Sequence, residues 1–334
     1  MEKNHLPKEY QRYQKVFSKQ KAQWFPKKRS WDHGIDLKPN APSSLPGKVY
    51  FLTQLEQIAL KEFLKKQLEK GYIQPSKSPY ATPFFFIKKK SRELRPVQDY
   101  RKVNEWTVKN RYPLPLISEL INWVKGASLF SKFNVRWGYN NIQIKEGDEW
   151  KAAFTTNQGL FEPKVIFFGL TNSPATFQAM MNDIFKEEIR EGWVSIYMDD
   201  ILIHTDNDIV KHQEYVYQIL QKLEENDLYL KLEKCAFKQQ RIKFLGVVLE
   251  GGTIQMDLSK IKGVANWPAP KTVKDVWAFL GFTGFYCYFV PNYSNIARPL
   301  IDLTKKATPF HWEIPQFKAF ETMKTLMCQK PILR

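Results

Sequence analysis

Two adjacent carboxylates in an apolar stretch are the residues of this chain best suited to chemistry. Asp199 and Asp200 lie between the strand-like runs 193–196 and 201–203. Such a pair is costly to hold near a core unless a positive group neutralises it, and a divalent metal ion is the simplest such group. Oxygen ligands favour a hard ion such as Mg²⁺, which also binds substrate phosphates. An Asp-Asp pair alone is more often a solvated turn, so its interpretation depends on the rest of the chain.

The charge of the chain indicates the kind of substrate. The 334 residues include 51 Lys and Arg but 34 Asp and Glu, which gives a net charge of +17 and a pI of about 9.5. This excess favours a polyanionic partner, nucleic acid before an anionic membrane surface. The sequence has neither the roughly 18 consecutive apolar residues of a membrane-spanning helix nor a signal-peptide core. We therefore expect a soluble intracellular protein that performs metal-assisted phosphoryl transfer on a nucleic acid.

The periodicity of the apolar residues predicts the elements that position the acid pair. Thr53 as N-cap and Gly71 as stop bound an amphipathic helix, and the apolar run 84–87 predicts a strand that ends in a basic hairpin. Further helical patterns occupy residues 173–190, 208–227 and, in two pieces, 257–297, and strand patterns occupy 129–144, 193–203 and 242–249. The acid pair thus lies at the centre of a predicted hairpin.

The residues around the acid pair match a known family. Residues 197–200, Tyr-Met-Asp-Asp, carry the YxDD signature of reverse transcriptases, and their surroundings resemble the gypsy-type (Metaviridae) family of long-terminal-repeat retrotransposons. The resemblance also includes residues 94–101, 110–115, 167–170 with 172–178, 244–246, and 279–282 with 285–286. It covers nearly the whole chain. YxDD alone would be weak, whereas several ordered motifs at family spacing are specific.

The resemblance implies a fold and a division into domains. The fold class is α+β, a right-hand polymerase with fingers, a palm built on an antiparallel sheet with helices, and a thumb. A basic N-terminal arm would occupy 1–45, fingers and palm 46–250, the thumb 251–297 and a connection segment 298–334.

The resemblance also implies an RNA-directed and DNA-directed DNA polymerase. Such an enzyme transfers a nucleotide from a dNTP to a primer 3′-hydroxyl with two Mg²⁺ ions, for which Mn²⁺ is a substitute. The implied partners are an RNA template, a DNA primer, the RNA/DNA hybrid and the dNTP, with no membrane partner. In the family the ions are held by the acid pair and by a third aspartate on an earlier palm strand. Asp199 would be the principal ligand, assisted by Asp200.

This chain departs from the family at that third position. Within residues 130–139 the family pattern has an Asp after Phe or Leu, and here the residue is Asn134. An amide keeps one neutral acceptor oxygen but loses the negative charge and the ability to bridge two cations. The nearest other acids, Asp148 and Asp183, lie in a turn-like segment and on a predicted helix. We therefore expect an impaired polymerase, and the alternative is an inactive protein of this fold that binds an RNA/DNA duplex.

Further site residues follow from the resemblance alone. Lys89 and Arg95 would hold the triphosphate, and the ring of Tyr139 would exclude a 2′-hydroxyl. Phe168 and Gly169 would lie under the templating base pair. The primer grip would consist of Phe244, Leu245 and Gly246, and the general acid that protonates pyrophosphate would be Lys234.

Several features lack a catalytic pattern. Cys235, Cys287 and Cys328 have no metal-ligand spacing and are expected to be reduced thiols, and the histidines have no nucleophile pattern around them. The chain also contains no motif of a ribonuclease H, integrase or protease segment. We therefore expect a segment of a polyprotein in the cytoplasm, in virus-like particles, with the nucleus as the alternative.

Overall fold

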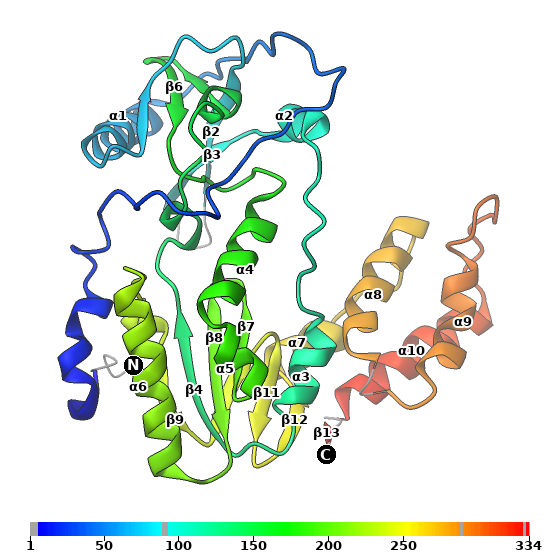
Figure 1. Ribbon diagram of the computed structural model, residues 1–334. Helices are drawn as coiled ribbons and strands as arrows, with labels where there is room; N and C mark the ends of the chain where they lie inside the picture. The colour runs from blue at the N-terminus through cyan, green and yellow to red at the C-terminus, as the bar shows by residue number, and fades with distance from the viewer. Residues whose placement is uncertain (1–5, 89–92, 288–289, 330–331, 334) are drawn as a thin grey trace. The chain divides into compact units, whose positions relative to one another are not determined.

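The computed structural model describes residues 6–88, 93–287, 290–329 and 332–333, and these form two compact units (Figure 1). Unit 1 consists of the described residues within Met1–Leu116, Lys132–Ile203 and Gln213–Ala236. Unit 2 consists of those within Ile117–Ser131, His204–His212 and Phe237–Arg334. The chain therefore passes between the units several times.

The first sheet belongs to unit 1. Its strands run in the order β1-β6-β5-β2-β3, and all neighbours are antiparallel except β2 and β5. The strands are β1 (Ile73–Pro75), β2 (Thr82–Lys88), β3 (Leu94–Gln98), β5 (Phe154–Thr156) and β6 (Gly159–Pro163). Helix α1 (Gln54–Glu69) packs beside β1 and β3 (Figure 1). Thr53 caps this helix in a capping box with Glu56, which confirms the helix predicted from Thr53 onwards.

The second sheet carries the acid pair. Its strands run in the order β7-β8-β4-β9, with the bounds β4 (Leu129–Asn134), β7 (Val194–Tyr197), β8 (Asp200–Thr205) and β9 (Ala236–Gln239). Along the chain, β4 continues from unit 2 into unit 1 and β8 from unit 1 into unit 2. The strand predicted over 129–144 ends at Asn134, and the 3-10 turn η2 (Gly138–Asn141) occupies part of the remaining range; a further 3-10 turn, η3 (Glu149–Ala152), comes before β5.

Helices accompany the second sheet. They are α4 (Ser173–Ile184), α5 (Lys186–Glu191) and α6 (Ile209–Glu225), and the 3-10 turn η4 (Leu232–Lys234) follows α6; helix α2 (Arg101–Trp106) instead follows β3 of the first sheet. Helix α4 is fixed to the β7–β8 hairpin by Gln178, whose side chain donates to Ile196 O at 3.3 Å and accepts from Met198 N at 2.8 Å. A buried polar side chain with both its groups paired fixes the position of the hairpin turn.

The basic N-terminal segment, which the sequence assigns to an arm, contains a helix. Residues Lys8–Phe17 form the 3-10 helix η1, in which Tyr10, Tyr13 and Val16 are buried. The ring centroid of Tyr10 lies 5.3 Å from that of Tyr217 on α6. Buried aromatic area stabilises this docking.

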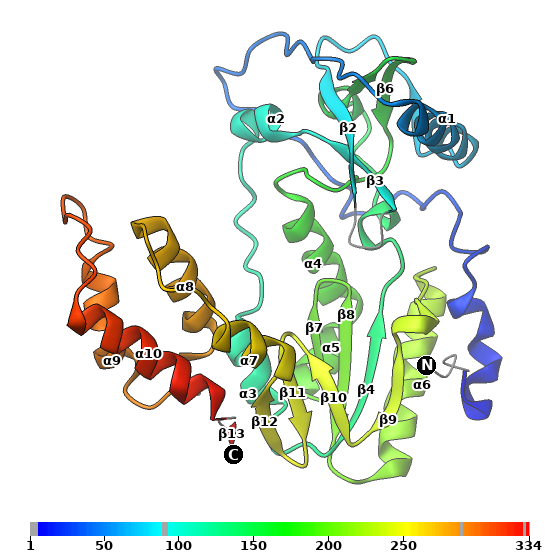
Figure 2. The same cartoon turned by 180° about the vertical axis from the view of Figure 1, so that it is seen from behind.

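Unit 2 contains a third sheet and most of the C-terminal helices. Its sheet is antiparallel in the order β10-β11-β12-β13, namely Arg241–Phe244, Val247–Glu250, Thr253–Met256 and Ile332–Leu333. The helices are α3 (Ile117–Trp123), α7 (Leu258–Ala265), α8 (Val273–Phe285), α9 (Tyr293–Asp302) and α10 (Ile314–Cys328). Helices α9 and α10 lie side by side in both views, and Phe279, Leu300 and Phe320 are buried in the core of this helical group (Figure 2).

The observed architecture is α+β with mainly antiparallel sheets, which confirms the predicted fold class. The predicted boundary between residues 297 and 298 lies inside α9, and the division into arm, fingers with palm, thumb and connection remains a prediction. Among the helices that the structure describes, none has the length and apolar character needed to cross a membrane.

Candidate active site

The strands of the second sheet bring position 134 next to the acid pair. Asn134 is the last residue of β4, and Asp200 is the first residue of β8, the neighbouring strand. Asp199 lies in the tight turn between β7 and β8, where Met198 has a φ of 54° and Tyr197 pairs with Asp200. The predicted convergence of three positions from two parts of the sequence is therefore present in unit 1.

The Asn134 side chain contacts both carboxylates directly. Its Nδ2 donates to Asp199 Oδ2 and to Asp200 Oδ1, each at 2.9 Å. Asn134 is 6% exposed, and its Oδ1 has no hydrogen-bond partner in the described part of the chain. The amide thus turns its donor toward the acid pair and leaves its acceptor buried and unpaired.

The side chains at the acid pair meet only part of the needs of a hard divalent ion. The half-buried carboxylates of Asp199 and Asp200 suit such an ion, because Mg²⁺ binds one or two carboxylates and keeps water or phosphate as its other ligands. Asn134 in this orientation does not suit it, since an N–H group cannot coordinate a cation. No group of three or more His, Cys, Asp and Glu side chains able to hold a metal occurs among the described residues. Asp199 and Asp200 therefore suit a divalent ion, but Asn134 does not supply a third anionic ligand.

A cavity of about 140 Å³ adjoins Asp199. It is lined by Trp137, Gly138, Tyr139, Phe168, Phe177, Met198, Asp199 and Lys231. The ring centroid of Tyr139 lies 4.9 Å from that of Phe168 and 5.8 Å from that of Phe177, so the three rings form one aromatic wall. Burial, with a smaller contribution from the charge of Asp199, raises the pKa of Tyr139 to about 12, and its hydroxyl therefore stays protonated at neutral pH.

Arg95 reaches this wall from β3. Its guanidinium carbon lies 4.9 Å from the ring centroid of Phe168, a cation–π distance, while the Phe168 side chain is 56% exposed. The next residue, Gly169, has a φ of 111°, and a Cβ there would lie 3.2 Å from the ring of Tyr100. Glycine is required at this point by both conformation and space. Lys89, the other predicted phosphate ligand, lies outside the described residues.

The two lysines that follow α6 are placed differently. Lys231 lines the cavity, and its backbone N–H donates to Asn134 O at 2.9 Å. Burial lowers the pKa of Lys231, the charge of Lys234 lowers it further, and Asp199 acts in the opposite direction. Lys234, which the resemblance favoured as the general acid, is exposed in η4 and is not among the residues that line the cavity. Sequence reasoning missed Lys231.

Trp137 is a second residue that the sequence did not single out. It has a left-handed backbone with a φ of 50°, which is uncommon for a bulky residue. The Lys70 amine lies 4.6 Å from its ring centroid. No local signal in the sequence indicates the left-handed backbone conformation of Trp137. For Lys231, the apolar residues that precede it could have indicated a strand-like segment beside β4.

The predicted primer grip lies in unit 2. Phe244 ends β10 with 2% exposure, and Leu245 and Gly246 form the turn to β11 with φ values of 45° and 86°. The Tyr286 hydroxyl donates to Gly246 O at 3.2 Å, and a Cβ on Gly246 would lie 3.1 Å from that hydroxyl oxygen. The turn is therefore tightly held within its own unit.

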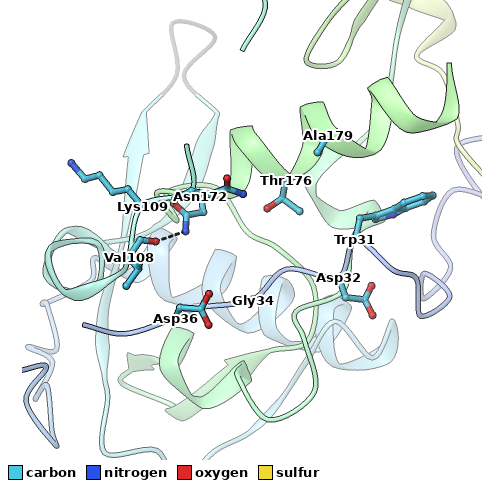
Figure 3. Close-up of a pocket in the computed structure, with 10 residues that line it drawn as sticks. Trp31, Asp32, Gly34, Asp36, Val108, Lys109, Asn172, Thr176 and Ala179 are labelled. Carbon is cyan, nitrogen blue, oxygen red and sulfur yellow. Dashed lines mark hydrogen bonds between the residues drawn. The ribbon is translucent and has the colours of Figure 1, made fainter. Parts of the chain in front are cut away.

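A larger cavity of about 350 Å³ lies elsewhere in unit 1 (Figure 3). Its walls include Trp31, Asp36, Lys109 and Thr176. Asn172 holds one wall in place, because its side chain donates to Val108 O at 2.8 Å and accepts from Asn110 N at 3.0 Å. These bonds give residues of the 110–115 and 172–178 motifs a structural role.

Comparison with known proteins identifies the family. Residues 87–249 match the family model described as reverse transcriptase (RNA-dependent DNA polymerase). This part of the chain belongs to the reverse transcriptase family. The match includes β4, the β7–β8 hairpin and therefore all three positions of the acid site.

Relatives of this chain occur in retrotransposon polyproteins. The chain is 33% identical over 308 residues to the retrovirus-related Pol polyprotein from transposon 297 of Drosophila melanogaster, covering 90% of the chain and 29% of that polyprotein. It is 35% identical over 290 residues to the transposon Tf2-3 polyprotein of Schizosaccharomyces pombe, covering 87% and 22%. The chain thus spans between a fifth and a third of the length of these relatives, which confirms the predicted resemblance to retrotransposon reverse transcriptases.

Solved structures confirm the polymerase fold of the reverse transcriptase. The foamy viral protease-reverse transcriptase in complex with RNA/DNA hybrid matches with a TM-score of 0.79 at 22% identity, covering 98% of this chain and 45% of that one. The foamy viral protease-reverse transcriptase dRH in complex with double-stranded DNA matches with a TM-score of 0.82 at 21% identity, covering 98% of this chain and 58% of that one.

Proposed function

We propose that this chain is the polymerase part of a gypsy-type retrotransposon reverse transcriptase, an RNA-directed and DNA-directed DNA polymerase whose activity is reduced by Asn134. The observation that carries the proposal is the meeting of Asn134, Asp199 and Asp200 beside the aromatic cavity. The reverse transcriptase domain over residues 87–249 supports the same reaction class.

The acid pair would hold the metal ions of the reaction. Mg²⁺ fits the oxygen chemistry of Asp199 and Asp200, with Mn²⁺ as a substitute. When bound, such ions supply positive charge that favours deprotonation of a primer 3′-hydroxyl and stabilises the leaving pyrophosphate. Asn134 offers no anionic oxygen to a second ion, and this is the proposed cause of the reduced activity.

The remaining residues of the site would bind and orient the nucleotide. Arg95, on the exposed face of Phe168, can turn toward triphosphate oxygens, and Lys89 would assist it by family resemblance. Tyr139 bounds the cavity next to Asp199, where its ring would exclude a 2′-hydroxyl. Phe168 and Gly169 would support the templating base pair.

The proposed substrates and partners are an RNA template, a DNA primer, their hybrid and a dNTP. Two structural neighbours are complexes with RNA/DNA hybrid and with double-stranded DNA, which supports this choice. We assign residues 1–45 to an arm, 46–250 to fingers and palm, 251–297 to the thumb with the grip at 244–246 before it, and 298–334 to a connection segment. The expected location is the cytoplasm, in virus-like particles, with the nucleus as the alternative.

A second candidate function is duplex binding without catalysis. The two hydrogen bonds from Asn134 to the acid pair favour it, because they occupy carboxylate oxygens that a metal ion would otherwise use. The net charge of +17 serves duplex binding as well as polymerisation.

Primer extension with and without Asn134→Asp separates the two functions. A restored ligand charge should be worth several kcal/mol, and about 1.36 kcal/mol is tenfold in rate, so Mg²⁺-dependent extension should rise by about 10²-fold or more. Duplex affinity should change little. In the restored protein, Asp199→Asn should abolish extension.

The matched control is Asn295→Asp, which makes the same change of charge at an exposed amide on α9. It should leave extension unchanged. The proposal fails if the original protein extends a primer as fast as the Asn134→Asp variant, because another residue must then complete the site. Polymerase activity is excluded as well if neither form extends a primer that both of them bind.

A further inference from the structure

We infer that the Asn134 amide acts as a built-in substitute for a cation, so that the Asp199–Asp200 pair is stable without metal and binds divalent ions weakly. The inference concerns the resting state of the acid pair. It rests on the proposed function only for the identity of the ion, since the hydrogen bonds are present whatever reaction the chain performs.

The first observation is that the amide contacts both acids at once. One nitrogen lies 2.9 Å from Asp199 Oδ2 and 2.9 Å from Asp200 Oδ1, and each of its two protons serves a different carboxylate. This is the bridging position between the two acids. A Mg²⁺ ion lies about 2.1 Å from its oxygen ligands, so an ion that bridged these oxygens from the side of Asn134 would meet the amide hydrogens.

The second observation is the unpaired end of the amide. Asn134 Oδ1 is buried and has no hydrogen-bond partner among the residues described. Turning the amide over would offer this oxygen to an ion, but it would remove two charge-assisted hydrogen bonds and set three oxygens against one another until the ion arrived. Leaving Oδ1 unpaired is therefore the more favourable arrangement in the absence of metal.

The third observation is that the backbone holds the amide in place. Val135 N donates to Asp199 O at 2.8 Å, and Lys231 N donates to Asn134 O at 2.9 Å. Asn134 is thus fixed between the hairpin turn and the segment that carries Lys231. The Lys231 amine also lines the cavity beside Asp199 and adds positive charge there. The main chain of Asn134 therefore cannot move away from the acid pair without breaking these bonds.

Replacing the amide by a carboxylate should make the stability of the acid pair depend on a bound metal ion. In Asn134→Asp three carboxylates meet, and their repulsion destabilises the folded state when no metal is present. A bound ion relieves that repulsion and stabilises the folded state in proportion to its occupancy. Metal should therefore stabilise the variant strongly and the original protein hardly at all.

Thermal unfolding tests this dependence on metal without any polymerase assay. The original chain and Asn134→Asp would be unfolded after chelation and again with Mg²⁺ or Mn²⁺. Without metal, the variant should unfold at a lower temperature than the original. With metal its midpoint should rise by several degrees, against less than about one degree for the original. Asn295→Asp, the control for charge alone, should behave as the original does.

Direct binding of Mn²⁺, followed by its electron paramagnetic resonance signal, tests the blocking role of the amide. Asn134→Asp should bind at least about tenfold more tightly than the original chain. Asn134→Ala is the deciding variant, because it removes the amide and adds no ligand. It should bind Mn²⁺ more tightly than the original if the amide blocks the site, and equally or less tightly if Asn134 is only a poor ligand. Asn134→Ser serves the same comparison should the Ala variant fail to fold.

Two results would overturn the inference: equal Mn²⁺ affinity of the original and Asn134→Asp, or binding by both Asn134→Ala and Asn134→Ser that is no tighter than that of the original. Failure of the proposed function looks different. A restored protein that binds Mn²⁺ tightly but extends no primer would refute the polymerase proposal and leave the inference about the acid pair standing.

Discussion

At position 134, an amide nitrogen stands where the resemblance to reverse transcriptases predicts a carboxylate oxygen. The side chains of Asn and Asp have nearly the same shape, so the sheet accommodates either. They differ by one unit of charge, and the Asn amide nitrogen donates hydrogen bonds where a carboxylate oxygen accepts them. The effect of having Asn instead of Asp at position 134 is therefore confined to the acid pair. The fold around it, including the cavity lined by Tyr139, is expected to remain intact when the residue is exchanged.

Tyr139 gives a prediction that depends on this intact cavity. In an Asn134→Asp background, Tyr139→Ala should admit ribonucleotides more readily, because the ring that adjoins Phe168 and Phe177 is removed. Forcing a group into filled space typically costs about 1–3 kcal/mol, so discrimination against ribonucleotides should fall about 5- to 150-fold. Steady-state kinetics with matched dNTP and rNTP measure the ratio.

The matched control is Tyr139→Phe, which keeps the ring and removes the hydroxyl. Its discrimination should stay close to that of the Tyr139 protein. If Tyr139→Ala discriminates as well as its parent, the ring does not bound the 2′ side of the sugar.

A second prediction at the residue scale compares two lysines. In the Asn134→Asp background, Lys231→Met should slow single-turnover extension by about 10²-fold, within the range of a lost general acid, whereas Lys234→Met should slow it less than about threefold. The reason is position, since Lys231 lines the cavity with Asp199 and Lys234 is exposed. A larger effect at Lys234 would return the role of general acid to the residue that the sequence favoured.

At the scale of elements, the sequence predicted what depends on local pattern. The helix from Thr53 follows from its capping box and apolar period, and the β7–β8 hairpin follows from its apolar flanks. The cavity could not be predicted in this way. Lys231 reaches it only because Leu230 pairs with Val135 across 95 positions of the sequence, and no local rule encodes that pairing.

The start of α6 gives a prediction for pH dependence. His212 is fully buried in unit 2, where Ser131 Oγ and Thr205 Oγ1 each lie 2.8 Å from one of its ring nitrogens. Burial, with a smaller effect of Lys238, lowers its pKa to about 4. The folded state thus keeps the ring neutral, while the unfolded chain binds a proton below about pH 6.5. Stability from this group is present above pH 6.5 and is lost as the pH falls toward 4.

Urea unfolding at pH 7.5 and pH 5 measures this loss. For His212 it should amount to on the order of 2 kcal/mol, and His212→Gln, although less stable at pH 7.5, should lose correspondingly less between the two pH values. His311→Gln, at an exposed position, should keep the full pH dependence of the original. An unchanged pH dependence in His212→Gln would exclude a neutral buried ring at this position.

At the scale of the whole molecule, composition and motif order predicted the class and the family, because both are properties of the entire sequence. The N-terminal segment carries nine basic residues within positions 1–30, and η1 within it is folded. Leu230 N donates a hydrogen bond to Val16 O of η1, and the ring of Tyr10 contacts that of Tyr217. These contacts join η1 to parts of the chain about 200 positions away. The count of charged residues predicts a polyanionic partner, whereas the packing of η1 depends on contacts between distant residues that only the folded chain reveals.

The net charge of +17 gives the last prediction, which concerns binding of a recessed primer-template duplex. Each phosphate contact releases counterions, so the logarithm of the affinity should fall linearly with the logarithm of salt concentration, with a slope of about −0.9 per contact. Several contacts therefore mean a loss of about 10²-fold or more between about 50 and 200 mM salt. Because the contacts are spread over the surface and Asn134 is 6% exposed, Asn134→Asp should show the same slope as the original. Fluorescence anisotropy of a labelled duplex measures both proteins, and an affinity independent of salt would mean that the positive charge does not bind the duplex.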